Sequence, residues 1–143
     1  MARPRSVLDT NVLVSALLTP GDCRRIVDLW MQNPCFDVVT CPRLILELET
    51  VLRRRKIRAC VSHRASDALL SALTVGALWF PDPVASSFRL RDRNDEFVAQ
   101  LAFDADAELL VSGDRDVLAL GRQDNFSCVA PRDGVAIIER WCE

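Results

Sequence analysis

Two short apolar stretches of this chain are each followed by a carboxylate just before a predicted helix. This recurring arrangement constrains the fold more than any other feature of the sequence. The first is 6–8, followed by Asp9, and the second is 108–112, followed by Gly113 and Asp114. A short apolar run bounded by polar residues is typical of a buried strand, so each carboxylate should emerge at a strand's carboxyl end. In an open α/β sheet, ligands bind in the crevice outside these ends. The two carboxylates are therefore candidates for one site.

Strands and helices alternate along the rest of the sequence. We expect further strands at 36–40, 78–80 and 127–130, and helices at 11–18, 23–32, 42–52, 62–73, 95–105, 117–120 and 131–141. Such alternation predicts an α/β fold, in which right-handed crossovers place helices against a parallel sheet. The 143 residues, 50% of them hydrophobic, fit one compact domain that covers positions 1–143.

A third carboxylate precedes another predicted helix. Asp95 falls in its first turn, at the end of the stretch Asp92-Arg93-Asn94-Asp95. Taken one at a time, Asp9, Asp95 and Asp114 are each explained as helix caps, because Asp is a favoured cap and the helix dipole stabilises an anion there. Capping does not explain why all three acids should reach the same edge of one sheet.

A fourth acid lies on the helix predicted at 42–52. The apolar stripe of this helix is made by Leu44, Ile45, Leu48, Val51 and Leu52. At about 100° per residue, Glu47 and Glu49 lie on opposite margins of the stripe, each roughly 90–110° from its centre. Either carboxylate could lean into a pocket while its stem packs on the core, so periodicity leaves the choice open.

Carboxylates that converge in one cleft repel one another, and a cation is the usual means of neutralising them. Oxygen ligands select Mg²⁺ or Mn²⁺, which can activate a water molecule and bridge to a phosphate, so we predict hydrolysis of a nucleic-acid backbone. Receiver domains and aspartyl phosphotransferases also place Asp at strand ends, but they need a lysine from a later strand end. The only lysine, Lys56, lies in a basic segment, and the transferases need a second Asp where this chain has Asn11.

Several other classes are excluded by what the sequence lacks. With His63 as the single histidine and no Cys-x-x-Cys pair, neither a structural zinc site nor a Ser-His-Asp hydrolase is expected. We expect the six cysteines to be buried or incidental thiols. None of the five glycines belongs to a phosphate-binding loop. No apolar run is long enough to span a membrane and Asp9 interrupts any signal peptide, so we expect a cytoplasmic protein.

Four stretches of the sequence together form a recognisable series. They are Leu8-Asp9-Thr10-Asn11-Val12, Leu44 to Leu52 with Glu47, Asp92-Arg93-Asn94-Asp95, and Ser112-Gly113-Asp114-Arg115-Asp116. In this order and spacing, across most of the chain, they resemble the PIN domain family, and within it the VapC-type toxin ribonucleases of bacterial toxin-antitoxin pairs. The resemblance implies a three-layer α/β/α sandwich around a parallel sheet, and an endoribonuclease that depends on Mg²⁺ or Mn²⁺.

The resemblance assigns site residues one by one. Asp9, Glu47, Asp95 and Asp114 match the four catalytic metal ligands, Asp116 matches an auxiliary acid, and Thr10, Asn11 and Ser112 match positions that hydrogen-bond the ligands. The choice of Glu47 over Glu49 rests on the resemblance alone. The chain departs from many relatives in having Asp92-Arg93 in place of Asp-Pro, and Ser112 in place of Thr, but neither change removes a ligand. The resemblance also implies a homodimer and an antitoxin segment that enters the acidic cleft.

The charge distribution bears on an RNA substrate. The net charge is -2, but setting the five assigned acids aside leaves 15 acids against 18 Lys and Arg. Basic residues cluster at 53–58 and at 89–93, and we predict that Arg54, Arg55 and Arg58 bind RNA. The alternative for such clusters is a solvated helix face. The alternative to the enzyme is a PIN-like module that binds RNA or a protein without cleaving, and the complete set of acids argues against it.

Overall fold

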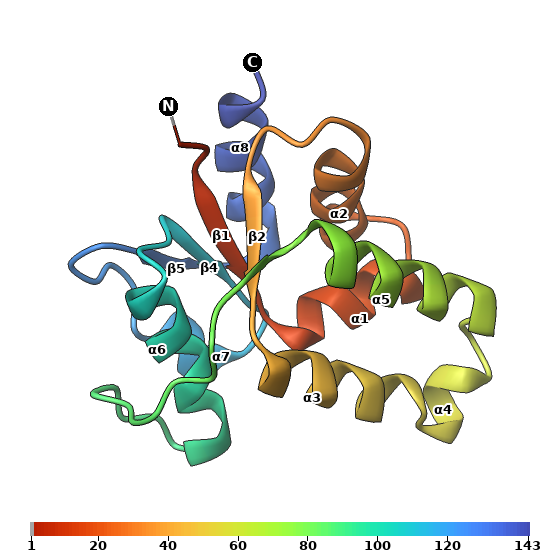
Figure 1. Cartoon of the computed structure of the whole chain (residues 1–143), viewed down its shortest axis with the longest axis horizontal. Helices are drawn as coiled ribbons and strands as arrows, with labels where there is room; N and C mark the ends of the chain where they lie inside the picture. The colour runs from red at the N-terminus through yellow and green to blue at the C-terminus, as the bar shows by residue number, and fades with distance from the viewer. Residues whose placement is uncertain (1) are drawn as a thin grey trace.

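A parallel five-stranded sheet lies at the centre of the molecule, for which the computed structural model describes residues 2–143 (Figure 1). The strands are β1 (Arg5–Leu8), β2 (Asp37–Thr40), β3 (Leu78–Trp79), β4 (Leu109–Val111) and β5 (Ser127–Val129). They lie in the order β3-β2-β1-β4-β5, and every neighbouring pair is parallel. The strand order therefore reverses between β1 and β4, which is where ligands bind in sheets of this kind.

Helices cover both faces of the sheet. They are α1 (Thr10–Leu18), α2 (Asp22–Gln32), α3 (Pro42–Leu52), α4 (Arg55–Arg58), α5 (His63–Gly76), α6 (Glu96–Asp104), α7 (Arg115–Leu118) and α8 (Pro131–Trp141), with a 3-10 turn, η1, at Arg93–Asp95. Figure 1 shows α6 on one side of the sheet and α2 and α8 on the other. The predicted three-layer α/β/α fold is confirmed. The short helix α4 was not predicted, because Ile57 is its single apolar residue and gives no periodicity.

The central strands are buried on both faces, which explains their short and continuous apolar sequences. Val7, Leu8 and all three residues of β4 are at most 3% exposed. Helix α8 approaches β4 so closely that a Cβ added at Gly134 would lie 3.2 Å from a Val111 methyl group. A larger residue there would need Val111 or α8 to shift by a few tenths of an ångström. This close packing lies directly before Ser112, the first of the polar side chains that follow β4.

Both ends of the described chain lie at the amino ends of the strands (Figure 1). Strand β1 begins at Arg5, and α8 runs back from the end of β5 to finish at Trp141. The carboxyl ends of the strands are therefore left to the loops and helix starts. Among residues 2–143, no helix is long and apolar enough to cross a membrane.

The expectation that all six cysteines are thiols is wrong for two of them. Cys35, in the loop before β2, and Cys142, which ends α8, form a disulfide with Cα atoms 5.2 Å apart. The two positions are 107 residues apart in sequence, and they meet because α2 packs against α8 and Phe36 packs against Trp141 with ring centroids 6.0 Å apart. The other four, Cys23, Cys41, Cys60 and Cys128, are free, and burial raises the pKa of Cys41 to about 11 and that of Cys128 to about 12.

Candidate metal centre

A pocket of about 380 Å³ opens where the strand order reverses between β1 and β4. Four acids line it, and each comes from a different part of the fold: Asp9 follows β1, Glu47 lies on α3, Asp95 precedes α6, and Asp114 precedes α7. Residues of α1 and the end of α3 complete the wall. Segments more than a hundred residues apart in sequence therefore bring the four predicted acids to one place.

Asp9 is the most tightly held of the four acids. It is 6% exposed, and its Oδ1 accepts a hydrogen bond of 2.8 Å from the backbone N–H of Thr10. Its Oδ2 accepts one of 2.8 Å from the Ser112 hydroxyl and one of 3.1 Å from the Asn11 side-chain amide. Three donors fix both oxygens, so the orientation of this carboxylate is set before any ligand arrives.

The loop after β4 is joined to the start of α1 by the same polar side chains. The backbone N–H of Gly113 donates to Asn11 Oδ1 over 2.8 Å, and that of Asp114 donates to the Ser112 hydroxyl over 3.0 Å. A Cβ at Gly113 would lie 3.3 Å from Asn11 Oδ1, so glycine permits this close approach. Asn11 and Ser112 therefore tie Asp9 and Asp114 into one unit.

Asp95 does not cap the helix that it precedes. The side chain of Asp92 accepts the hydrogen bond from Asn94 N at 2.9 Å, and Asp95 makes no side-chain cap bond to α6. Capping therefore does not account for the Asp95 carboxylate, which lines the pocket. By contrast, Asp9 and Asp114 both cap helices and line the pocket, each capping through its Oδ1.

The structure separates Glu47 from Glu49, which periodicity could not do. Glu47 is half-buried in the acidic pocket. Glu49 turns to another cavity beside α5, where Arg58 and His63 also lie, and its carboxylate is 3.8 Å from Arg53. Of the two margins of α3, the one that carries Glu47 faces the end of β1.

The acids of the pocket raise one another's pKa values. For Asp95, burial and then the charges of Asp114, Asp92 and Asp9 raise the pKa to about 7, and a hydrogen bond with Asp114 adds to this. Burial raises the pKa of Asp9, and the charge of Asp114 raises it further, against its three hydrogen bonds. Burial and Asp9 also raise the pKa of Glu47. The pocket thus favours a positive charge, whether protons or a metal ion.

The four carboxylates of the pocket fit Mg²⁺ or Mn²⁺, which prefer carboxylate, carbonyl and water oxygens. The hydroxyl of Thr10 lowers the pKa of Glu47, yet it is buried and makes no hydrogen bond of good geometry with any described residue. As they stand, no three acidic, His or Cys side chains among residues 2–143 are grouped closely enough to enclose an ion. The case for a metal ion therefore rests on the oxygen ligands present and on their location in one pocket.

Asp116 is not part of the pocket wall, and its backbone N–H donates to Asp114 Oδ1 over 2.8 Å.

The three arginines that were predicted to bind RNA lie at and on α4 but do not line one pocket. Arg54 lines the acidic pocket, Arg55 is exposed on α4, and Arg58 lies against His63 in the neighbouring cavity. The sequence analysis missed Arg43, which with Arg54 lowers the pKa of Glu47. The signal was available, because Arg43 is four residues before Glu47 and so lies on the same face of α3.

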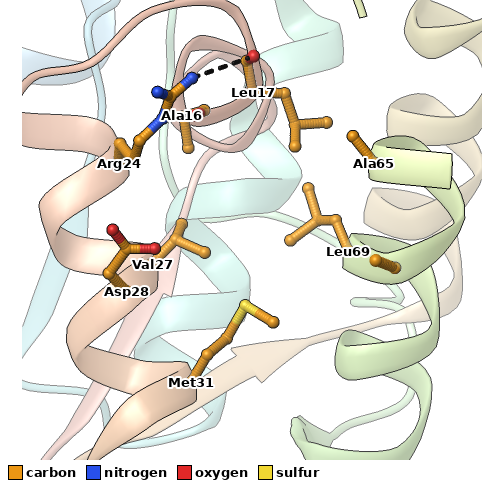
Figure 2. A pocket seen from close by; sticks show the side chains of 9 residues that line it. Ala16, Leu17, Arg24, Val27, Asp28, Met31, Ala65 and Leu69 are labelled. Atoms are coloured by element: carbon orange, nitrogen blue, oxygen red, sulfur yellow. Dashed lines mark hydrogen bonds between the residues drawn. The ribbon is translucent and has the colours of Figure 1, made fainter. Parts of the chain in front are cut away.

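A second cavity, of about 280 Å³, lies between α2 and α5 (Figure 2). Its lining is largely apolar and includes Ala16, Leu17, Val27, Met31, Ala65 and Leu69. Asp28 is its one acid, and the Arg24 guanidinium donates to the carbonyl of Ala16 over 2.9 Å. A single carboxylate does not make a metal centre, so the acidic pocket is the candidate site.

The raised pKa of Asp95 predicts how pH acts on the metal-free protein. A folded-state pKa of about 7, against an ordinary 3.8, means that the folded protein holds this proton more tightly than the unfolded chain. The resulting stabilisation is complete below pH 3.8 and is lost as pH rises through about 7. In EDTA, the melting temperature should therefore fall between pH 5.5 and pH 8. Thermal melts of Asp95→Asn should show a smaller fall, and an equal fall would show that other groups cause it.

The chain is similar to known proteins in both sequence and fold. A family model described as PIN domain matches residues 5–116. The fold is similar to that of PAE2754 from Pyrobaculum aerophilum, with a TM-score of 0.63, 13% identity and 96% of each chain covered. It is also similar to a chain of VapBC2 from Rickettsia felis, solved with a DNA fragment from the promoter, with a TM-score of 0.59, 16% identity, and 88% of this chain and 98% of that chain covered. No protein of curated function matches the sequence.

Proposed function

This chain belongs to the PIN domain family, and from that premise we propose that it is a divalent-metal-dependent endoribonuclease, the toxin of a toxin-antitoxin pair. PIN domains are generally nucleases, which supports the broader class. One observation carries the finer proposal: Asp9, Glu47, Asp95 and Asp114 line a single pocket from four parts of the fold, and capping leaves Asp95 unexplained. An RNA- or protein-binding module without activity would not need this complete set.

Asp9, Glu47, Asp95 and Asp114 would hold the metal ion, and Asp116, two residues after Asp114 and outside the pocket wall, would be an auxiliary acid. Bound Mg²⁺ or Mn²⁺ supplies a water molecule of lowered pKa and stabilises the leaving oxygen of the phosphodiester. Asn11 and Ser112 keep Asp9 in one orientation, so little reorganisation is needed when the metal and the RNA bind. Arg54, on the pocket wall, offsets the repulsion between the acids and an incoming phosphate.

The test is RNA cleavage by the purified protein with and without metal. We expect cleavage of RNA in Mn²⁺ or Mg²⁺ and none in excess EDTA, because the carboxylates alone provide no competent nucleophile. Adding the metal back should restore activity. Cleavage that is equal in EDTA would exclude the metal mechanism, and RNA binding without cleavage in any of these metals would favour the binding module.

We also propose that the protein forms a homodimer and binds an antitoxin protein. The similarity of its fold to a chain of VapBC2 from Rickettsia felis, solved with promoter DNA, supports a partner of this type. The reading frame directly upstream of the gene is the place to look for it, because a small DNA-binding protein encoded there would be the natural partner.

A further inference from the structure

Two arginines flank Glu47, one near each end of α3. Arg43 is the second residue of α3 and lies four residues before Glu47, a spacing that places side chains over one another on a helix. Arg54 follows the end of α3 at Leu52, has an extended backbone, and lines the acidic pocket together with Glu47. The acidic pocket therefore has a cationic side chain near either end of α3.

Arg43 is held in place without an acidic partner. Its guanidinium carbon lies 4.2 Å from the centre of the Phe97 ring, and Phe97 is itself 4% exposed and fixed in the core. Its Nη2 donates weakly, over 3.5 Å, to the carbonyl of Asn94, next to the pocket acid Asp95. The backbone N–H donates to Asp82 over 2.8 Å, which anchors the start of α3.

The donors of both arginines remain open to a ligand. In the described part of the chain, ion pairs within 4.0 Å join only Arg3 to Asp37 and Arg53 to Glu49. Arg43 and Arg54 are both exposed, and each lies near enough to Glu47 to lower its pKa. A planar guanidinium that is already stacked on a ring loses little freedom when it binds a phosphate through two parallel hydrogen bonds.

We propose that Arg43 and Arg54 bind the RNA phosphates on either side of the one to be cleaved, so that a single strand runs along α3 across the acidic pocket. This inference rests on the proposed function. A pocket of four acids repels a polyanion, and two cations beside it, of which Arg43 is held against Phe97, would supply the attraction while leaving the acids to the metal. Arg43 is then a residue that positions the substrate, on the side opposite the basic segment.

The experiment measures binding of a single-stranded RNA oligonucleotide in EDTA, where no cleavage occurs, at several salt concentrations. Each phosphate contact contributes about 0.7 to the slope of log K against log salt for single strands. Arg43→Ala and Arg54→Ala should each lower the slope by about 0.7, and the double variant by about 1.4. Arg140→Ala, at the far end of α8, is the matched control and should keep the wild-type slope. Arg43→Lys should keep the slope but bind more weakly, because lysine lacks the planar fork.

A second measurement separates substrate binding from support of Glu47. The rise in melting temperature on adding Mn²⁺ should survive in Arg43→Ala if the arginine contacts RNA. An unchanged salt slope in Arg43→Ala would overturn the inference, and loss of the Mn²⁺ shift with an unchanged slope would assign Arg43 to Glu47 instead. The salt slope is measured without metal. It therefore tests the role of Arg43 independently of whether the wild type cleaves RNA.

Discussion

Asp9→Asn is expected to abolish most of the stabilisation that Mn²⁺ gives to the folded protein. A ligand that binds only the folded state stabilises it by about 2.7 kcal/mol at a hundredfold excess over Kd, and this gain depends on the ligating carboxylate. Without metal, the variant should melt close to the wild type. The new NH2 group replaces either the oxygen that accepts from both Ser112 and Asn11 or the one that accepts from Thr10 N–H. The substitution also removes a charge whose burial is unfavourable, as the raised pKa of Asp9 indicates.

The two glutamates of α3 provide the matched control. Glu47→Gln should lose the Mn²⁺ shift in melting temperature, because this side chain lines the acidic pocket. Glu49→Gln changes the same functional group two residues away, in a different cavity, and should keep the full shift. If Glu49→Gln lost the shift and Glu47→Gln kept it, the helical ligand would be misassigned. If no variant differed from wild type, the carboxylates would not share a metal.

In the same variants we expect a large loss of RNA-cleaving activity, although the metal-free protein should melt close to the wild type. Loss of a residue that merely orients a metal ligand costs about 10–100-fold in affinity or activity, so loss of the Asp9 carboxylate itself should cost at least about a hundredfold. Single-turnover cleavage at saturating Mn²⁺ would measure this. Full activity of Asp9→Asn at saturating metal would remove Asp9 from the ligand set.

Breaking the disulfide between Cys35 and Cys142 should lower the free energy of unfolding more than any other change proposed for this protein. A cross-link between positions 107 residues apart restricts the unfolded chain strongly, and the loop-entropy model gives about 4.7 kcal/mol for a 100-residue loop. Measured values are usually about 2–4 kcal/mol, which corresponds to a fall in melting temperature of roughly 5–15 °C for a chain of this size. Melts of the oxidised protein with and without a dithiol reductant would show it.

Cysteine variants identify the bond responsible for that change. Cys35→Ser, Cys142→Ser and the double variant should all melt at about the same lower temperature, because each removes one and the same bond. None of the three should respond to the reductant. Cys60→Ser alters an exposed free thiol and should behave as the wild type. A wild type that melts at the same temperature in reductant would mean that the bond contributes nothing to stability.

The sequence predicted the elements that depend on local pattern. The strands before Asp9 and Asp114 were found because a parallel sheet buried on both faces requires unbroken apolar runs, and the acids were placed because they follow those runs directly. Helix α4 was missed for the opposite reason, since its basic sequence has no apolar stripe. It forms at the end of α3, where Ile57 packs against the core.

What the sequence could not decide depends on packing between distant segments. Glu47 and Glu49 are equivalent by periodicity, and they are separated only because α3 packs against α1 on one side and α5 on the other. The sequence alone could not show whether Asp95 caps its helix. In the structure Asp92, three residues earlier, makes the capping hydrogen bond in the turn instead. The pairing of Cys35 with Cys142 required the docking of α2 on α8, which no local pattern records.

The position of the chain ends has a practical consequence. Both ends of the described residues lie at the amino ends of the strands (Figure 1). The acidic pocket, in contrast, opens at the carboxyl ends of β1 and β4. A fluorescent protein, an affinity tag or a surface anchor joined next to residue 2 or residue 143 would therefore sit at the opposite end of the strands from the pocket. Labels attached at these positions suit single-molecule work because they leave the pocket open to solvent.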